Sequence, residues 1–266
     1  MNMNKRKLKA IELFAGAGGM ALGLQQAGID VVGLVEIDKF CLATLGANRN
    51  RYFPRARIIK ADLSKISGRE ILAAARIEKG DLDILSGGPP CQGFTWSNKN
   101  RSVDDPRSQM MWHFIRLVGE IKPCCFVIEN VPGVLSFKEF FIELLGDLEG
   151  KGYIVRFNLM DAASYGVPQR RRRIFIEGTR KDLGSEPAFA APTHFDLDKD
   201  KGAIPCSAVA IKSFAEHGFE KGQVKYVRWN TKLDILMDKR TAAETVEQAV
   251  RQLLIEGLLQ AAHKTG

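Results

Sequence analysis

Phe14-Ala-Gly-Ala-Gly-Gly19 is the stretch that decides the fold, because it joins an apolar run to a segment with a helical pattern. Glycine adopts backbone conformations that other residues avoid, so this turn can be sharp and can approach a ligand closely. A glycine-rich turn between a strand and a helix is typical of nucleotide-binding sheets. The stretch therefore predicts a cofactor site, although an ordinary tight turn can have the same composition.

Outward from this turn, short apolar runs alternate with longer amphipathic stretches from Leu8 to about Gly178. This rhythm is typical of parallel strands joined by crossover helices, and near-continuous apolar strands suit a sheet covered on both faces. We therefore predict an α/β domain over residues 1–178. Its expected strands are Lys9 to Phe14, Val31 to Val35, Arg57 to Ile59, Leu82 to Leu85, Cys125 to Ile128, Ile154 to Leu159 and Arg173 to Ile176.

Acidic residues follow the second and third expected strands. Glu36 is placed to accept hydrogen bonds from ribose hydroxyls, and Asp62 to accept one from an adenine amino group. The pattern by itself does not choose between a dinucleotide and S-adenosylmethionine.

Cys91 lies in Gly87-Gly-Pro-Pro-Cys-Gln92, after the strand expected at Leu82 to Leu85. Open parallel sheets place their ligands at this end of the strands, and a rigid Pro-Pro turn fixes the direction of the thiol. We interpret Cys91 as a nucleophile rather than a buried core cysteine. Cys124 and Cys125 begin an apolar strand, so for them the core interpretation is favoured.

Glu129-Asn-Val-Pro132 follows the strand that ends at Ile128, on the same sheet edge as Cys91. A carboxylate there can exchange a proton with a bound base, or it can be a surface or capping acid. Pro168-Gln-Arg-Arg-Arg-Arg-Ile174 enters the last strand, and arginine there suits phosphate or carbonyl recognition. A solvated basic edge is the alternative for any single arginine.

Taken together and in this order, the glycine turn and the Pro-Pro-Cys-Gln, Glu-Asn-Val and Gln-Arg-x-x-Arg elements resemble those of the DNA (cytosine-5)-methyltransferase family. The resemblance covers Ile11 to about Gly178. It implies the S-adenosylmethionine-dependent, Rossmann-like sheet, mostly parallel with one antiparallel strand near its end. It implies S-adenosylmethionine as the cofactor, bound by Phe14, Gly16, Gly18, Gly19, Glu36, Ile37, Asp62 and Pro90.

The same resemblance implies the chemistry. Cys91 adds to C6 of a cytosine in duplex DNA, which activates C5 toward the methyl group. Glu129 hydrogen-bonds N3 and the exocyclic amine, while Arg171 and Arg173 contact the base carbonyl O2 and order the site. Reaching C6 requires the base to flip out of the duplex.

The segment from Gly93 to Asp105 resembles the mobile loop with which this family closes over DNA. An ordinary exposed loop is the alternative. The expected DNA contacts in and beside this loop are Gln92, Ser97, Lys99 and Arg101.

The resemblance ends after Gly178. Prolines and a charged stretch predict a linker or covering segment over residues 179–240, and Thr241-Ala-Ala-Glu244 with apolar residues at helical spacing predicts an amphipathic helix over 241–266. We recognise neither a target-recognition domain nor the family's final cofactor-closing motif. The pattern favours the catalytic subunit of a two-polypeptide enzyme, and a truncated inactive member is the alternative.

Three rival functions share part of the pattern. A tRNA cytosine-5 methyltransferase would use the same cysteine and glutamate, but Thr95-Trp96-Ser97 favours the DNA enzymes. A non-catalytic subunit would be expected if Cys91 or Glu129 were missing, and both are present. A nicotinamide-dependent oxidoreductase explains only the glycine turn.

Composition and charge narrow the possible partners and the cellular location. The net charge of +8 and pI near 9.3 suit a polyanionic partner, although a merely basic protein is equally compatible. We find no apolar run long enough to span a membrane and no signal peptide. The five cysteines lack the spacing of a metal site or disulfide framework, so we expect no metal and a cytoplasmic location.

Overall fold

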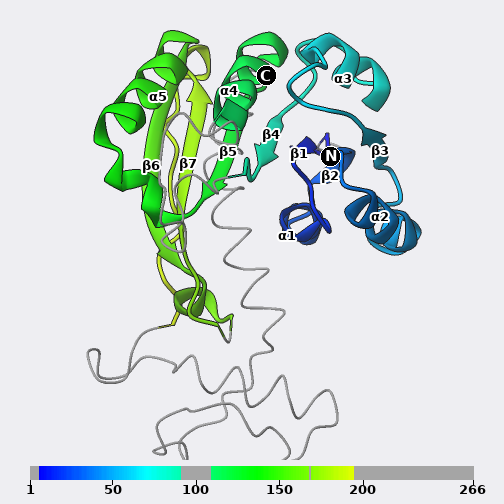
Figure 1. Cartoon of the computed structure of the whole chain (residues 1–266), viewed down its shortest axis with the longest axis horizontal. Coiled ribbons are helices and arrows are strands. Elements are labelled where there is room, and N and C mark those ends of the chain that lie inside the picture. Colours follow the sequence, from blue (N-terminus) through cyan, green and yellow to red (C-terminus); the bar gives the residue numbers. More distant parts are fainter. Residues whose placement is uncertain (1–5, 91–108, 168, 195–266) are drawn as a thin grey trace, which may run out of the picture.

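A computed structural model of the chain describes residues 6–90, 109–167 and 169–194. In this part of the chain seven strands form one sheet with helices on both faces (Figure 1). The strands are β1 (Lys9–Leu13), β2 (Asp30–Glu36), β3 (Arg57–Lys60), β4 (Ile84–Gly87), β5 (Cys125–Asn130), β6 (Tyr153–Asp161) and β7 (Arg172–Arg180). The α-helices are α1 (Gly19–Gln26), α2 (Lys39–Tyr52), α3 (Gly68–Ala75), α4 (Gln109–Ile121) and α5 (Lys138–Gly150). The short 3-10 helices are η1 (Pro132–Ser136), η2 (Ala162–Tyr165) and η3 (Lys181–Leu183).

The strand order is β3-β2-β1-β4-β5-β7-β6. β1 pairs in parallel with β2 and with β4, whereas β7 runs antiparallel to both of its neighbours, β5 and β6. The order therefore reverses between β1 and β4, which is where open α/β sheets bind their ligands. Each of the seven expected strands overlaps an observed one, so the predicted α/β class with one late antiparallel strand is confirmed.

Two apolar cores hold the layers together. Helices α3, α4 and α5 cover one face of the sheet, and α1 and α2 cover the other (Figure 1). The first core includes Phe114 of α4 and Phe126 of β5, and the second includes Leu24 of α1 and Leu45 of α2, all nearly inaccessible to solvent. Burial on both faces explains why the strands are near-continuous apolar runs.

Polar residues set the limits of several elements. The Asp38 carboxylate accepts hydrogen bonds from the N–H groups of Phe40 and Cys41 and so begins α2. β4 begins later than the run from Leu82 predicts, and just before it the Asp83 carboxylate accepts the Lys9 N–H at 2.7 Å and pairs with Arg6. The Asp83 backbone also bonds to Lys9 and Cys125, so side-chain and backbone bonds together fix the entry to β4.

The chain after β7 packs back against the sheet. Glu186 forms an ion pair with Arg156 of β6 at 2.8 Å, and the Tyr165 hydroxyl donates to the Ala190 carbonyl at 3.0 Å. The N–H groups of Thr193 and His194 both reach the Ser164 carbonyl at 2.9 Å. Residues 195–266, with the rest of the expected linker and the expected final helix, lie outside the described residues.

A separate observation concerns membranes. Among the described ranges, no helix is both long and apolar enough to cross a bilayer.

Two acids are buried within the sheet. Burial is the main cause that raises the pKa of Glu12 in β1, and of Glu177 in β7, to about 8. Between the ordinary carboxyl pKa and this raised value, the folded state binds more protons than the unfolded state. Stability therefore falls as pH rises through this window.

We expect Glu177→Gln to flatten this dependence, because glutamine does not ionise. Between about pH 5 and about pH 8, the parent chain should lose on the order of a few kcal/mol of unfolding free energy, and the variant about half of that, since Glu12 still contributes. Urea unfolding at the two pH values measures the difference. Glu143→Gln, at an exposed position of α5, is the matched control. An equal loss in the parent chain and in Glu177→Gln would contradict the assignment.

Candidate active site

The glycine turn links β1 to α1 through three residues with left-handed backbone conformations. Phe14, Gly16 and Gly18 have φ angles of 53°, 56° and 89°. A Cβ atom on Gly18 would lie 2.9 Å from Leu45 Cδ2, whereas one on Gly16 or Gly19 would meet no atom within 4 Å. Gly18 is therefore required by both backbone conformation and space, while Gly16 leaves the turn open on its outer side.

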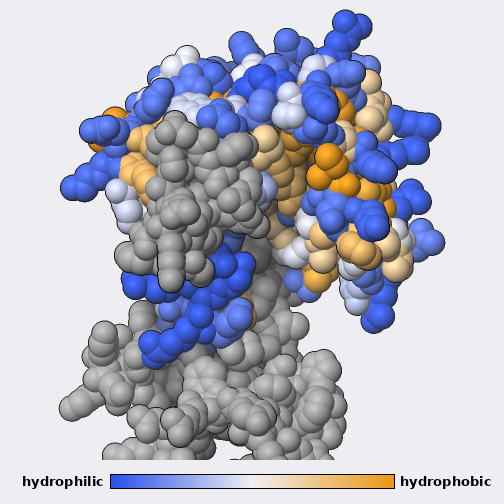
Figure 2. All heavy atoms as spheres, in the orientation of Figure 1, coloured by the Kyte–Doolittle hydropathy of each residue, from blue (hydrophilic) through white to orange (hydrophobic). Residues whose placement is uncertain are grey.

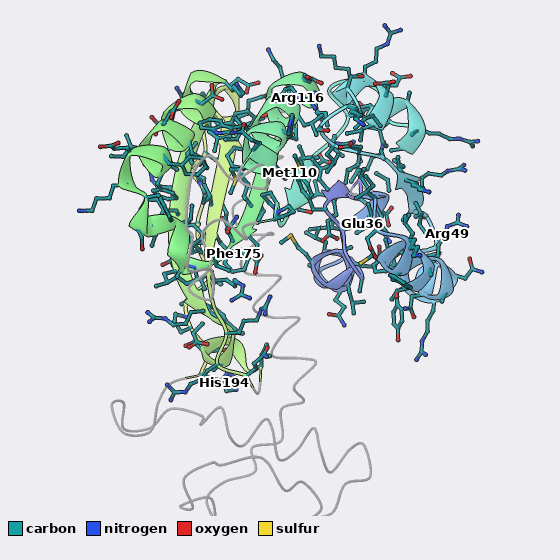
Figure 3. The ribbon with its side chains drawn as sticks, viewed as in Figure 1. Glu36, Arg49, Met110, Arg116, Phe175 and His194 are labelled. Atoms are coloured by element: carbon teal, nitrogen blue, oxygen red, sulfur yellow. The ribbon has the colours of Figure 1, made fainter. Side chains whose placement is uncertain are left out.

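Glu36 holds this turn against the end of β2. Its Oε2 accepts the Gly16 N–H at 2.7 Å, and its Oε1 accepts the N–H groups of Ile37 and Asp38 at 2.7 and 2.9 Å. Glu36 lies between α1 and α2 (Figure 3), beside Ile37, whose side chain is 57% exposed. The structure thus brings together four residues predicted from sequence: Gly16, Gly18, Glu36 and Ile37.

Asp62 follows β3 and heads a tight turn. Its Oδ1 accepts hydrogen bonds from the Ser64 hydroxyl at 2.6 Å and from the Ser64 N–H at 3.0 Å, and these bonds hold the pKa of the Asp62 carboxyl below its usual range. Lys65 lies 3.5 Å from Oδ2. Asp62 therefore presents an ionised carboxylate at the end of the strand next to β2.

β4 ends in the turn that leads to the predicted nucleophile. A Cβ on Gly87 would collide with the Leu13 carbonyl oxygen, so the backbones of β4 and β1 approach too closely for any other residue. Pro89 is buried and Pro90 is exposed. The next residues lie outside the described ranges, and with them the predicted site residues Cys91, Gln92, Ser97, Lys99 and Arg101.

Asn130 fastens this turn to β5, a role that the sequence did not single out. Its side chain is 1% exposed, and Nδ2 donates to the Pro89 carbonyl at 3.4 Å while Oδ1 accepts the Val131 N–H at 2.8 Å. The sequence feature that could have identified Asn130 is its position in Glu-Asn-Val, directly after the candidate acid Glu129. Asn130 therefore ties the residues before Cys91 to the strand that carries Glu129.

Glu129 forms the charged centre of the described site. Its Oε1 lies 2.8 Å from Arg173 Nε and 3.8 Å from an Arg171 guanidinium nitrogen. Its Oε2 would lie 3.2 Å from a Cβ at Gly88, so this second oxygen faces the turn that precedes Cys91. The predicted grouping of Glu129, Arg171 and Arg173 is thus present.

Asp161 places the arginine run beside Glu129. Its Oδ1 accepts the Arg171 N–H at 2.9 Å, across the antiparallel pair of β6 and β7. The described surface around this end of β6 and β7 is hydrophilic (Figure 2). Sequence reasoning missed Asp161 because its contact depends on the register of two strands.

Cys124 and Cys125 behave as expected for core residues. Cys125 is buried, and burial raises the pKa of its thiol to about 12. Cys124 is half-buried, with its thiol pKa also raised. A thiol with a raised pKa forms less of the nucleophilic thiolate, so the preference for Cys91 over this pair is consistent with the structure.

The glycine turn, the strand order and the antiparallel β7 together define the S-adenosylmethionine-dependent methyltransferase fold. The family model for C-5 cytosine-specific DNA methylases matches residues 8–255, and the chain belongs to this family. The match extends past Gly178, where the sequence motifs ended, so the family relationship covers more of the chain than the motifs alone indicated.

Individual relatives support membership of the same family. The chain is 41% identical over 187 residues to the type II methyltransferase M.XorII of Xanthomonas oryzae, covering 69% of this chain and 43% of that protein. It is 38% identical over 196 residues to the type II methyltransferase M.AquIA of a Picosynechococcus species, covering 70% of this chain and 77% of that protein. A solved E. coli structure described as a prophage-encoded DNA modification methyltransferase has a TM-score of 0.60 and 34% identity over 71% of this chain and 52% of that one. The chain thus spans less than half the length of M.XorII and about half that of the E. coli protein.

We expect Gly18→Ala to destabilise the fold by about 1–3 kcal/mol, because a Cβ would meet Leu45 and alanine resists the left-handed conformation. Gly19→Ala is the matched control, since it begins α1 with open space around it. Chemical unfolding of both variants measures the difference. Equal midpoints for the two variants would show that the turn relaxes freely.

Proposed function

We propose that the chain transfers a methyl group from S-adenosylmethionine to C5 of a cytosine flipped out of duplex DNA, through a covalent bond between Cys91 and C6. The observation that carries the proposal is the placement of Glu129. One of its oxygens is held by Arg173, and the other faces the Gly88 to Pro90 turn that leads directly to Cys91. An acid in this position suits the activation of cytosine, because the ring must be attacked by the thiolate at C6 while it accepts a proton or hydrogen bond at N3.

The residues that follow β1, β2 and β3 fit the proposed cofactor. Open space beside Gly16 and the exposed Ile37 side chain leave room for a nucleoside, and Glu36 and Asp62 present carboxylates on neighbouring strands. Glu36 and Asp62 would accept hydrogen bonds from the ribose and the adenine amino group, and Phe14, Gly18, Gly19 and Pro90 would complete the contacts. The bound cofactor supplies an electrophilic methyl group on sulfur.

The chain's own residues would perform the remaining steps. The Cys91 thiolate adds to C6, and the ring electrons shift toward N3 and C5, so that C5 becomes nucleophilic enough to take the methyl group. Glu129 hydrogen-bonds N3 and the exocyclic amine as charge develops there, while Arg171 and Arg173 bind O2 and fix the carboxylate. A base then takes the C5 proton, the electrons of that C–H bond re-form the double bond between C5 and C6, and the Cys91 thiolate leaves C6.

We further propose that the chain acts as the catalytic subunit of a split modification enzyme, with a second polypeptide that recognises the DNA target. Between β7 and His194 the described chain contains only η3 and a segment packed against η2 and β6, with no element suited to reading a DNA groove. M.AquIA, of which the match covers 77%, is a family member of comparable length.

Covalent trapping tests the catalytic proposal. With duplex DNA containing 5-fluorocytosine and S-adenosylmethionine, the chain should form an adduct at Cys91, since fluorine at C5 prevents the final elimination. Cys91→Ser should form none, and Glu129→Gln should form it about 10²- to 10⁴-fold more slowly. Cys41→Ser is the matched control. Adduct formation by Cys91→Ser, or preference for tRNA over duplex DNA in competition, would refute the proposal as stated.

Reconstitution tests the split proposal. Alone, the chain should bind DNA through salt-sensitive phosphate contacts with little sequence preference. Addition of the polypeptide encoded by an adjacent reading frame should produce site-specific methylation of plasmid DNA. Full site-specific activity of the isolated chain would mean that this chain recognises its target by itself.

A further inference from the structure

The turn from Asp62 to Ser67 is held by hydrogen bonds among its own residues. The N–H groups of Lys65 and Ile66 both donate to the Asp62 carbonyl at 3.0 Å, and the Asp62 side chain accepts from Ser64. Ser67 then caps α3 through reciprocal bonds with Glu70. All these bonds lie within one stretch of sequence, so they fix the shape of the turn without fixing its place in the molecule.

Arg116 of α4 supplies a long-range anchor. One of its terminal nitrogens donates to the carbonyls of Leu63 at 2.8 Å and Ile66 at 3.0 Å. Its other terminal nitrogen donates to Glu120 Oε1 at 2.6 Å, one turn along α4. Figure 3 shows Arg116 on the part of α4 next to α3. The planar guanidinium thus joins two backbone carbonyls of the turn to a carboxylate on α4, which a lysine cannot reproduce.

Glu120 continues the anchor to the start of α3. Its Oε2 accepts the Gly68 N–H at 2.6 Å. A Cβ on Gly68 would lie 2.8 Å from Ile121 Cγ1 and 2.9 Å from Glu120 Cβ, so the Gly68 backbone lies directly against α4. The turn is therefore held to α4 at Leu63, Ile66 and Gly68.

We propose that Arg116, supported by Glu120, is a positioning residue for cofactor affinity that sets the place of the Asp62 carboxylate at the adenine end of the site. This inference rests on the proposed function, because it takes Asp62 as the acceptor of the adenine amino group. Arg116 acts through the backbone of the turn. Loss of the anchor leaves the hydrogen bonds of Asp62 to Ser64 and the bond from the Ala61 N–H to the Glu36 carbonyl in place, but it frees the rest of the turn from α4, so that the Asp62 carboxylate is held less firmly.

Binding of S-adenosylhomocysteine to the full chain, measured by calorimetry below the unfolding temperature of every variant, tests this inference. Arg116→Met should weaken binding about 5- to 20-fold, and Arg116→Lys should weaken it less. Arg69→Met, at an exposed position of α3, is the matched control and should bind as the parent does. Unchanged affinity in Arg116→Met would overturn the inference.

A double-mutant cycle separates positioning from general destabilisation. If Arg116 acts through Asp62, Arg116→Met should weaken binding less than twofold in an Asp62→Asn background. Additive losses would assign Arg116 a merely structural role and overturn the inference.

Hydrogen exchange gives a readout that needs no cofactor. In Arg116→Met, the amide of Gly68, which donates across to Glu120, should exchange faster, while the amide of Ser64 within the turn and those of β3 remain protected. If the parent chain failed to bind S-adenosylhomocysteine, the proposed cofactor would be wrong and the affinity role of Arg116 would fall with it. Parent binding together with unchanged exchange in Arg116→Met would refute the positioning role alone.

Discussion

The parallel pairing of β1 with two partners is the constraint on which the rest of the structure depends. β2 lies on one side of β1 and β4 on the other, so the chain after β1 turns toward one half of the sheet and later returns to the other half. All parallel strands end at one edge, and the turns that follow β1, β2 and β3 meet there with those that follow β4 and β5. The proposed cofactor site and the proposed base site thus share one edge because of strand order.

Bonds from side chains to backbone hold this edge in place. Glu36 accepts from the glycine turn, Asn130 donates to the turn before Cys91, and Asp161 accepts from the arginine run. These bonds join different segments of the chain, whose bonded residues lie 10 to 41 positions apart. Asn130 is buried, and a buried polar group that lacks its partner costs free energy, so Asn130 in particular favours a single arrangement of the turns that it joins. In the described part of the site, the turns are thus fastened to each other as well as to their own strands.

The sequence predicted the sheet well and the supports of the site poorly, for a physical reason. Strands buried on both faces need apolar runs, so β1 to β7 were visible in the pattern, and Glu129 and Arg173 were found because they adjoin strand ends. Asn130, Asp161 and Arg116 act through contacts that only folding creates, the last with carbonyls 50 and 53 residues away. Glu177 directly follows the apolar run that ends at Ile176, and the pattern gave no sign that a carboxyl would be buried there. The contacts of Cys91 and of the expected DNA loop stay predictions, since these residues lie outside the described ranges.

The reversed direction of β7 determines where the chain can lead next. β7 begins beside Glu129 and finishes, at Arg180, on the opposite rim, by the first residue of β6. The segment that follows runs back along β6, where Glu186 pairs with Arg156, and returns to the first rim, where the His194 N–H donates to the Ser164 carbonyl. The segment thus spans the height of the sheet. The reversal of β7 therefore brings the chain, at His194, back to the rim that carries Glu129 and Arg171, where the proposed DNA substrate would approach.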